Sequence, residues 1–372
     1  MKHDPALPKH FSCIDAMRGI AALFVTIYHA TRFFVEDAAN FVIPVTVYEM
    51  PYGSWLWPAY LYGEDAVRLF WVISGFVFAH VYWTRPTNAR EFAVARFARL
   101  YPLHFVTLIL VAGMQMISMN TQGYWQITDN NDLKHFVLQL FLLDTVLNLS
   151  DGVSFNAPIW SVSAEIFIYV VFFFTLPLTR RNPLGGSILL AALSYVLLVQ
   201  TPASFIIGST VFACGVFFFA GGACYATFRA LGGDARLWGV SFALAVCAAL
   251  AAQYGYADVM LLSLCCAIVV ALAAAERYMR RRSQTLQFLG DISYSVYLVH
   301  MPIQIGALLV IDLWLGGGRD FAQSYLTLPL FLAVSIWVAH LTHKHFERPV
   351  GAWLRTRMMK SPDDLPVQSA PT

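Results

Sequence analysis

The sequence predicts an all-α protein, a polytopic bundle of about ten membrane-spanning helices with both termini cytoplasmic. The first observation is composition: 58% of the 372 residues are hydrophobic, 12% are charged, and the mean hydropathy is +0.61. Soluble domains carry about 25% charged residues. The second is length, because about ten stretches approach the roughly 20 apolar residues that a spanning helix needs. The third is a strong asymmetry in where Lys and Arg fall. The formal charge of only +2 argues against nucleic-acid binding.

Ten apolar stretches define the expected spans. They are 11–34, 66–83, 98–118, 158–178, 185–200, 204–228, 237–254, 258–276, 292–314 and 324–343. The first lies where a signal peptide would, but it is too long for one and contains Asp15 and Arg18. We therefore interpret it as a retained span.

An eleventh stretch, 133–149, is short and contains Lys134, His135 and Asp144. Lys and Arg stay on the cytoplasmic side of membrane proteins. If 133–149 crossed the membrane, every later basic cluster would change sides and the asymmetry would be lost. We therefore expect a re-entrant or surface-lying helix here, on the outer side. Only four of the 24 Lys and Arg residues then lie outside: Arg32, Arg68, Lys134 and Arg319.

The domain organisation is simple. Residues 1–349 are expected to form one transmembrane domain, and residues 350–372 a short cytoplasmic tail that is partly disordered. The six cysteines lie in apolar segments, which favours buried thiols over disulfides. His340 and His343 lack the spacing of a helical metal-binding pair, so no metal site is expected.

The stretch 11–34 contains three ionisable residues: Asp15, Arg18 and His29. Charges at membrane depth are costly and usually mark a function. Arg18 and His29 are eleven residues apart, which puts them within roughly 20° of the same helix face and about 16 Å apart along the axis. Asp15 is spaced to pair with Arg18, and that pair has a purely structural interpretation. His29 is a candidate general base, since neutral imidazole suits that role near pH 7.

Glu165 follows Trp160 by five residues, about one turn into an apolar stretch. It is either a buried partner for an Arg on another helix or a group that orients His29 or binds a hydroxyl substrate. Ser74 and Gly75 lie in a second apolar stretch, where a glycine permits either close helix packing or the approach of a ligand.

Arg96 and Arg99 lie in the cytoplasmic segment before the stretch 98–118 and at its start. Three residues apart, they share a helix face and are able to clamp phosphates. They also satisfy the positive-inside bias, and both interpretations hold together.

Five motifs together resemble acyltransferase family 3 of bacterial inner membranes. They are Ile14–Leu23 followed by Tyr28 and His29, Leu69–Phe76, Arg96–Pro102, Trp160–Glu165 and Gly290–His300. The resemblance runs from Phe11 to about Pro349. It implies a multi-pass enzyme that moves an acyl group, usually acetyl, from acyl-CoA to a hydroxyl of a cell-envelope glycan or its lipid-linked precursor. One departure is visible: Ile166 and Phe167 stand where the family often has a second acidic residue and an aromatic one.

The resemblance also implies roles for residues. The basic residue and histidine of the first motif correspond to Arg18 and His29, and the arginine pair associated with acyl-CoA corresponds to Arg96 and Arg99. Further positions carried over are Glu165 and the pocket residues Ser74, Gly75, Trp160 and Ser163. No bound cofactor is expected, and acyl-CoA is the donor substrate.

The expected mechanism is general-base catalysis by His29 on the acceptor hydroxyl, with Asp15 or Glu165 orienting the ring and Ser74 stabilising the oxyanion. A covalent acyl-His29 intermediate is an alternative. Two other classes of function stay open: a transporter or flippase of an envelope precursor, and a structural membrane protein.

Overall fold

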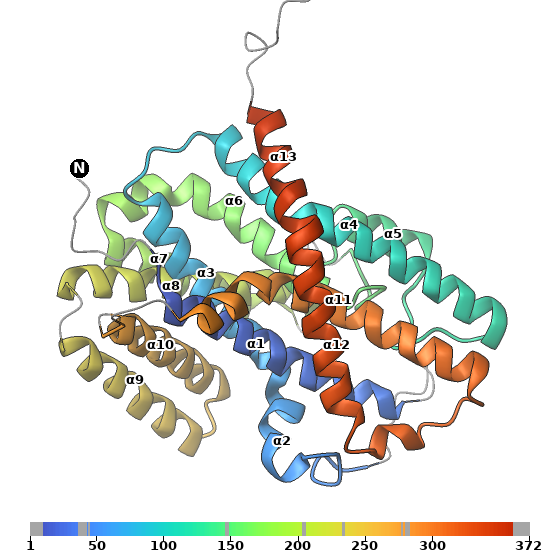
Figure 1. Cartoon of the computed structure of the whole chain (residues 1–372). Coiled ribbons are helices and arrows are strands. Elements are labelled where there is room, and N and C mark those ends of the chain that lie inside the picture. The colour runs from blue at the N-terminus through green and yellow to red at the C-terminus, as the bar shows by residue number, and fades with distance from the viewer. Residues whose placement is uncertain are drawn as a thin grey trace, which may run out of the picture.

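The computed structural model of the chain describes residues 10–35, 43, 45–145, 149–202, 206–232, 235–276, 278–279 and 283–359. Within these ranges every regular element is a helix, and the long helices pack side by side in one bundle (Figure 1). The all-helical bundle predicted from the sequence is therefore confirmed.

Each of the ten predicted spans corresponds to one helix. These are α1 (Ser12–Ala30), α3 (Ala66–Tyr82), α4 (Ala89–Gln122), α6 (Ile159–Arg181), α7 (Pro183–Gln200), α8 (Ile206–Leu231), α9 (Arg236–Gln253), α10 (Ala257–Glu276), α11 (Gln284–Trp314) and α12 (Thr327–Thr342). In the described ranges, nine helical stretches are long and apolar enough to cross a membrane. The tenth, α12, has 16 residues. It continues through a π-helical turn (His343–Glu347) into α13 (Arg348–Met359), and the three form one long rod (Figure 1).

The chain marks several helix ends with capping side chains. The Asn88 side chain accepts a hydrogen bond from the Glu91 backbone N–H at the start of α4, and Asn182 does the same for Gly185 at the start of α7. Such caps satisfy backbone donors that the first helical turn leaves free. At the end of α4, Gly123 adopts φ +82°, a left-handed conformation that glycine accepts without strain.

The segment predicted not to cross contains only the eight-residue helix α5 (Leu133–Leu140). Eight helical residues span about 12 Å, well short of the roughly 30 Å hydrocarbon core. Asp132 caps this helix by accepting from the His135 backbone N–H at 2.8 Å. Residues 146–148 of the segment lie outside the described residues.

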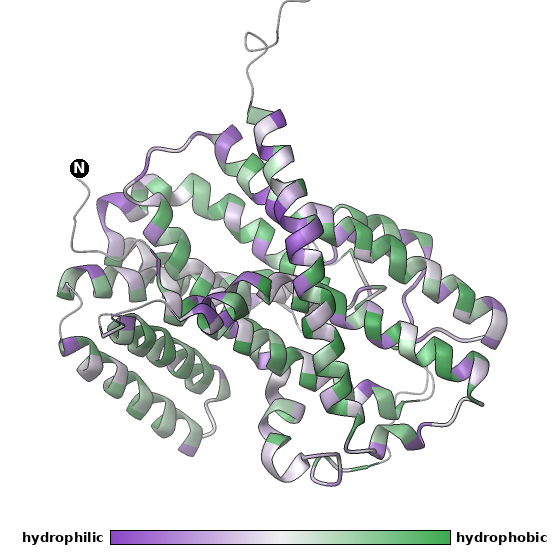
Figure 2. Cartoon of the chain, in the orientation of Figure 1, coloured by the Kyte–Doolittle hydropathy of each residue, from purple (hydrophilic) through white to green (hydrophobic). Residues whose placement is uncertain are grey.

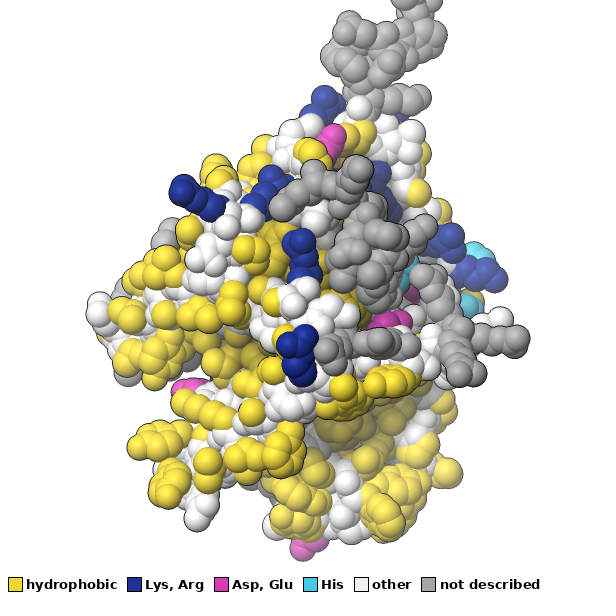
Figure 3. All heavy atoms as spheres, turned by 90° about the vertical axis from the view of Figure 1, so that its left-hand side faces the viewer, with side chains coloured by type: hydrophobic (Ala, Val, Ile, Leu, Met, Phe, Trp, Pro, Cys, Tyr) yellow, Lys and Arg dark blue, Asp and Glu magenta, His cyan; other side chains and the backbone are white. Residues whose placement is uncertain are grey.

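Charge and hydropathy follow the predicted asymmetry. Lys and Arg side chains gather in the upper part of the face seen in Figure 3, and hydrophobic side chains cover most of its lower part. In Figure 2, α9 and α10 are largely hydrophobic along their length, whereas α13 is mostly polar. Part of the expected cytoplasmic set lies outside the described residues: Lys2, Lys9, Arg277, Arg280, Arg281, Arg282 and Lys360. The tail beyond Met359 also lies outside them, whereas 350–359 belongs to α13, which packs on α4.

Helices α1 and α11 pack with their backbones in contact. A Cβ atom on Gly19 would overlap the backbone carbonyl of Leu289, and one on Gly290 would lie 2.8 Å from the Asp15 Cβ. Two glycines on opposite helices therefore permit the close approach, as small residues do at helix interfaces in membranes. This contact fixes the distance between the side chains that α1 and α11 present to each other.

An ion pair at the outer end of α11 ties the outer loops together. Arg319 contacts both carboxylate oxygens of Asp312, at 2.5 and 3.2 Å, and its Nε donates to the Val35 backbone carbonyl. The hydroxyl of Tyr124 and the amide of Gln126 donate to the same carboxylate, at 2.9 and 2.7 Å. The segment after α4 is thereby held beside the end of α1.

We predict that Gly19→Ala destabilises the bundle by about 1–3 kcal/mol, because the added methyl group overlaps a backbone carbonyl that cannot move alone. The measurement is the fraction of detergent-solubilised protein that stays monodisperse after heating. Gly113→Ala is the matched control: a Cβ there meets nothing within 4 Å, so an unchanged or slightly higher melting temperature is expected. Equal melting temperatures for the wild type and Gly19→Ala would contradict the close-packing argument.

Candidate functional site

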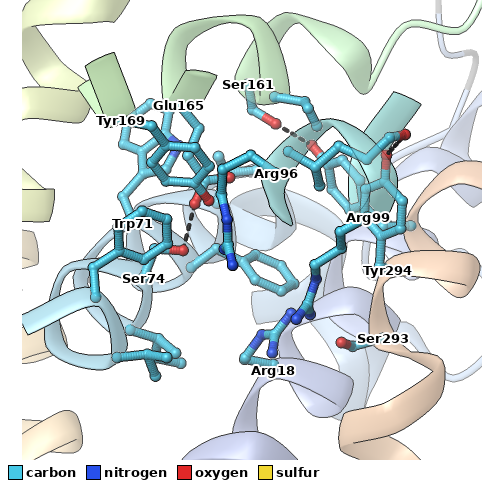
Figure 4. Close-up of a pocket in the computed structure, with 18 residues that line it drawn as sticks. Arg18, Trp71, Ser74, Arg96, Arg99, Ser161, Glu165, Tyr169, Ser293 and Tyr294 are labelled. Atoms are coloured by element: carbon cyan, nitrogen blue, oxygen red, sulfur yellow. Dashed lines mark hydrogen bonds between the residues drawn. The ribbon is translucent and has the colours of Figure 1, made fainter. Parts of the chain in front are cut away.

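An arginine-lined cavity opens among α1, α3, α4, α6 and α11. Arg18, Arg96 and Arg99 line it, and Glu165 is the one acidic residue among the lining side chains of this cavity. In Figure 4 the guanidinium groups of Arg18 and Arg99 point toward each other, and Arg96 extends toward the same space. Like charges this close repel, so the arrangement favours an anion between them. We call this space the inner cavity.

Aromatic rings hold Arg96 in place. Its Cζ lies 4.8 Å from the centre of the Phe78 ring and 5.9 Å from that of Tyr169, and the two rings stack at 4.2 Å. These cation–π contacts fix the guanidinium while leaving its donors unused. The buried Nε of Arg96 has no hydrogen-bond partner among the described residues. A buried unpaired donor of this kind is costly and suits a site that a ligand completes.

Glu165 is tied to α3 by a short hydrogen bond from the Ser74 hydroxyl (Figure 4). This hydrogen bond offsets part of the free-energy cost of a carboxylate at membrane depth. The hydrogen bond also directs the Ser74 hydroxyl proton at Glu165 and not at a reacting atom.

His29 lies near the outer end of α1, where it lines a second space of about 310 Å³. We call this space the outer vestibule. The His29 Nδ1 is 2.9 Å from the Val25 carbonyl and 3.2 Å from the His300 Nε2 on α11. The Gln304 amide donates to the His29 backbone carbonyl at 2.8 Å. Val25 and His300 therefore hold His29 through its Nδ1 atom, and Gln304 holds it through its backbone carbonyl.

Polar groups surround His29 in the vestibule: Tyr28, Arg32, Glu64, Thr128, Asp129, Asn130 and the ring of Trp160. The vestibule shares Glu64 and Trp160 with a larger outer groove of about 610 Å³. Both volumes lie in the range of small-molecule sites, roughly 300–1,000 Å³. Carboxylates, hydroxyl groups and an aromatic face make a lining that suits a polyhydroxylated ligand.

A wall of aromatic rings separates the inner cavity from the two outer spaces. Trp71 lines the inner cavity and the outer groove, and it meets Trp160 edge-to-face at 6.0 Å. Next to it, the Tyr297 hydroxyl bonds Ser161 at 2.7 Å and donates to the Pro158 carbonyl at 3.0 Å. The wall is thus one side chain thick at Trp71.

The structure divides the predicted site residues into three groups. Arg18, Ser74, Arg96, Arg99 and Glu165 line the inner cavity. His29 and Trp160 line the outer vestibule. Asp15, Gly75 and Ser163 line neither space: Asp15 lies 3.9 Å from Arg18 beside Gly290, Gly75 meets the backbone of Phe218 on α8, and Ser163 donates to the Leu142 carbonyl at 2.6 Å.

The orientation of His29 differs from the expectation. Asp15 or Glu165 was expected to orient the ring, but its Nδ1 contacts are the Val25 carbonyl and His300. In the sequence, His300 is marked only as the last residue of the motif Gly290–His300, and Gln304 lies outside all five motifs. Both His300 and Gln304 are polar residues inside the apolar stretch 292–314. Polar residues are rare in such stretches, and this rarity is the signal that identifies the two. In the described part of the chain, no cluster of three or more His, Cys, Asp or Glu side chains is placed to hold a metal ion.

The sequence also matches known proteins. Residues 11–343 match the family model for an acyltransferase domain. The chain is 29% identical over 351 residues to "Acyltransferase MdmB" of Streptomyces mycarofaciens, covering 83% of this chain and 86% of that protein. It is 29% identical over 211 residues to "Protein 2 in picA locus" of Rhizobium radiobacter, covering 53% of this chain and 97% of that protein. No solved structure matches the chain significantly.

Asp144, on the loop beside the outer groove, gives a pH prediction. Burial raises the pKa of its carboxyl to about 6, and its Oδ1 has no hydrogen-bond partner among the described residues. A raised pKa means that the folded state binds the proton more tightly than the unfolded state. Folding stability should therefore fall as pH rises from about 4 to about 6, by about 3 kcal/mol at most.

We accordingly predict that Asp144→Asn melts at a higher temperature than the wild type at pH 7.5, and that the difference shrinks toward pH 4.5. Thermal unfolding in detergent at both pH values measures this. Asp151→Asn is the control, because Asp151 is exposed on the same loop and pairs with Lys134. A difference between wild type and Asp144→Asn that does not vary with pH would rule out the linkage.

Proposed function

This chain belongs to acyltransferase family 3 and is a multi-pass membrane protein, and on that premise we propose a more specific reaction. It moves an acyl group, by preference acetyl, from acyl-CoA to a hydroxyl of a cell-surface glycan or of its lipid-linked precursor in a bacterial inner membrane. The observation that carries the proposal is the pairing of two unlike spaces: a cavity lined by three guanidinium groups and a vestibule that contains an imidazole.

The inner cavity suits the donor. Acyl-CoA carries phosphates, and guanidinium groups bind phosphates through charge-assisted hydrogen bonds. At about 90 Å³ the cavity is small, so it takes a thin chain such as the pantetheine arm rather than a nucleotide. The nucleotide end would then lie at the mouth, where Arg99 is exposed.

The arm has the reach that the geometry requires. Arg18 and His29 are eleven positions apart on α1, which is about 16 Å of helix. A donor held at the arginines is thus able to present its thioester near the wall beside the vestibule. Passage of the acyl group to the vestibule requires side chains of that wall to move, because Trp71 lines the inner cavity, Trp160 lines the vestibule, and the two rings are in contact.

The outer vestibule suits the acceptor. A hydroxyl near the His29 ring gives its proton to that ring while the oxygen attacks the thioester carbon. The C–S bond then breaks, and CoA leaves as the thiol once it has taken up the proton. Vestibule carboxylates such as Glu64 and Asp129 would accept hydrogen bonds from other hydroxyl groups of the acceptor.

We predict that His29→Ala abolishes acyl transfer, because a positioned general base contributes about 10²–10⁴-fold to the rate. The measurement is the ester-linked acyl content of surface glycans from three strains: wild type, a deletion, and the deletion carrying His29→Ala. Acyl groups should be absent from the last two. If His29→Ala restores acylation, His29 is not the general base. If deletion leaves the acyl content of the surface glycans unchanged, the acceptor is not a surface glycan.

We further predict that Arg96→Ala and Arg99→Ala raise the KM for acetyl-CoA by about 10-fold or more, since each removes a charge-assisted contact worth about 1.5–3 kcal/mol. Membranes supplied with radiolabelled acetyl-CoA give the rates. Arg181→Ala is the control, because Arg181 is an exposed arginine at the same end of the bundle and does not line the inner cavity. An unchanged KM in both cavity variants would argue that the donor binds elsewhere.

A further inference from the structure

The two buried histidines at the α1–α11 contact form a directed chain of hydrogen bonds. His300 is fully buried, and its Nδ1 lies 3.1 Å from the Val296 carbonyl one turn earlier on α11. A carbonyl only accepts, so the Nδ1 of His300 carries its proton. Its Nε2 is then the acceptor of the neutral ring.

The same reasoning fixes the protonation of His29. Its Nδ1 faces two acceptors, the Val25 carbonyl at 2.9 Å and the His300 Nε2 at 3.2 Å. A nitrogen placed between two acceptors must carry the proton. The Nε2 of neutral His29 is consequently left with its lone pair, on the ring that lines the outer vestibule.

We propose that His300 is the positioning residue of the transferase: it holds His29 in the tautomer whose Nε2 is free to take a proton from the acceptor hydroxyl. This inference rests on the proposed function. The Val25 carbonyl restrains the ring through one hydrogen bond on its own helix. A second acceptor on another helix fixes the plane of the ring as well.

The proton balance during transfer follows from this arrangement. The acceptor O–H bond breaks as the O–C bond to the acyl carbon forms, and the proton moves to the His29 Nε2. The imidazolium that results keeps donating from Nδ1 to His300 and Val25. The proton then leaves on the sulfur of CoA, which restores the neutral ring with the same tautomer.

Other charged groups of the vestibule do not replace His300. Arg32, Glu64 and Asp129 line the same space as His29. Among the hydrogen bonds of the described residues, however, the partners of the His29 ring are Val25 and His300 alone. The glycine contact brings the same two helices together about 15 Å farther in along their axes, and the His29–His300 bond joins them near their outer ends.

The test compares three substitutions of His300 in membranes from a deletion strain, with radiolabelled acetyl-CoA as the donor. Gln places an acceptor oxygen near the position of Nε2, Asn is too short to reach His29, and Leu has no acceptor. We expect His300→Gln to keep most of the kcat, and His300→Asn and His300→Leu to lose about 10- to 100-fold, with an unchanged KM for acetyl-CoA. His104→Gln is the matched control. His104 is buried on α4 and bonds the Gln139 carbonyl, so its kcat should stay within about twofold.

The outcomes separate this inference from the function on which it rests. If all three His300 variants lose kcat equally and melt at equally lowered temperatures, His300 is structural and the inference fails. It also fails if His300→Asn and His300→Leu retain kcat within twofold. If the wild type transfers no label, or His29→Ala transfers as much as the wild type, the proposed function fails instead.

Discussion

The backbone contact between α1 and α11 is the constraint on which the site depends. Gly19 and Gly290 leave no room for side chains at this interface, so the two helices approach closely over their inner halves. Farther out, the same two helices bring His29 and His300 together. A membrane offers no hydrophobic force between helices, so such packing and polar contacts are what hold them in register. The register of this pair therefore decides which atoms meet.

The chemical character of the residues that line the site changes with depth in the membrane. Residues from five helices meet at the inner cavity, and two of these helices, α1 and α4, bring three arginines there beside the expected cytoplasmic face. The outer spaces are lined by carboxylates, hydroxyl groups and aromatic rings, with one arginine in each, Arg68 in the groove and Arg32 in the vestibule. A donor with phosphates and an acceptor with hydroxyl groups would each meet the lining that suits its chemistry. In the proposed reaction the His29 imidazole serves the outer vestibule, so the acceptor would arrive from the outer side.

Hydropathy and charge predicted the fold well because each is a property of a stretch by itself. All ten predicted spans are helices, and within its described residues the segment 133–149 contains only the short α5. The surroundings of single side chains were harder to predict. Arg18 and His29 share one face of the first predicted span, yet the two residues line different spaces. Ser163 looked equivalent to its motif neighbours, but it bonds a loop carbonyl. Such outcomes depend on which helix packs opposite, and a single sequence without aligned relatives does not encode that visibly.

The aromatic wall also bears on the electrochemical state of the membrane. A bundle with water-filled spaces on both sides would conduct protons if those spaces joined, and the cell would lose stored energy through it. Trp71 against Trp160, with Tyr297 bonded to Ser161 beside them, puts tightly packed rings where such a join would form. Side chains that large exclude a chain of water molecules at rest. We therefore expect the protein to be insulating at rest, and in the proposed reaction any opening wide enough for an acyl group would have to be filled by the substrate itself.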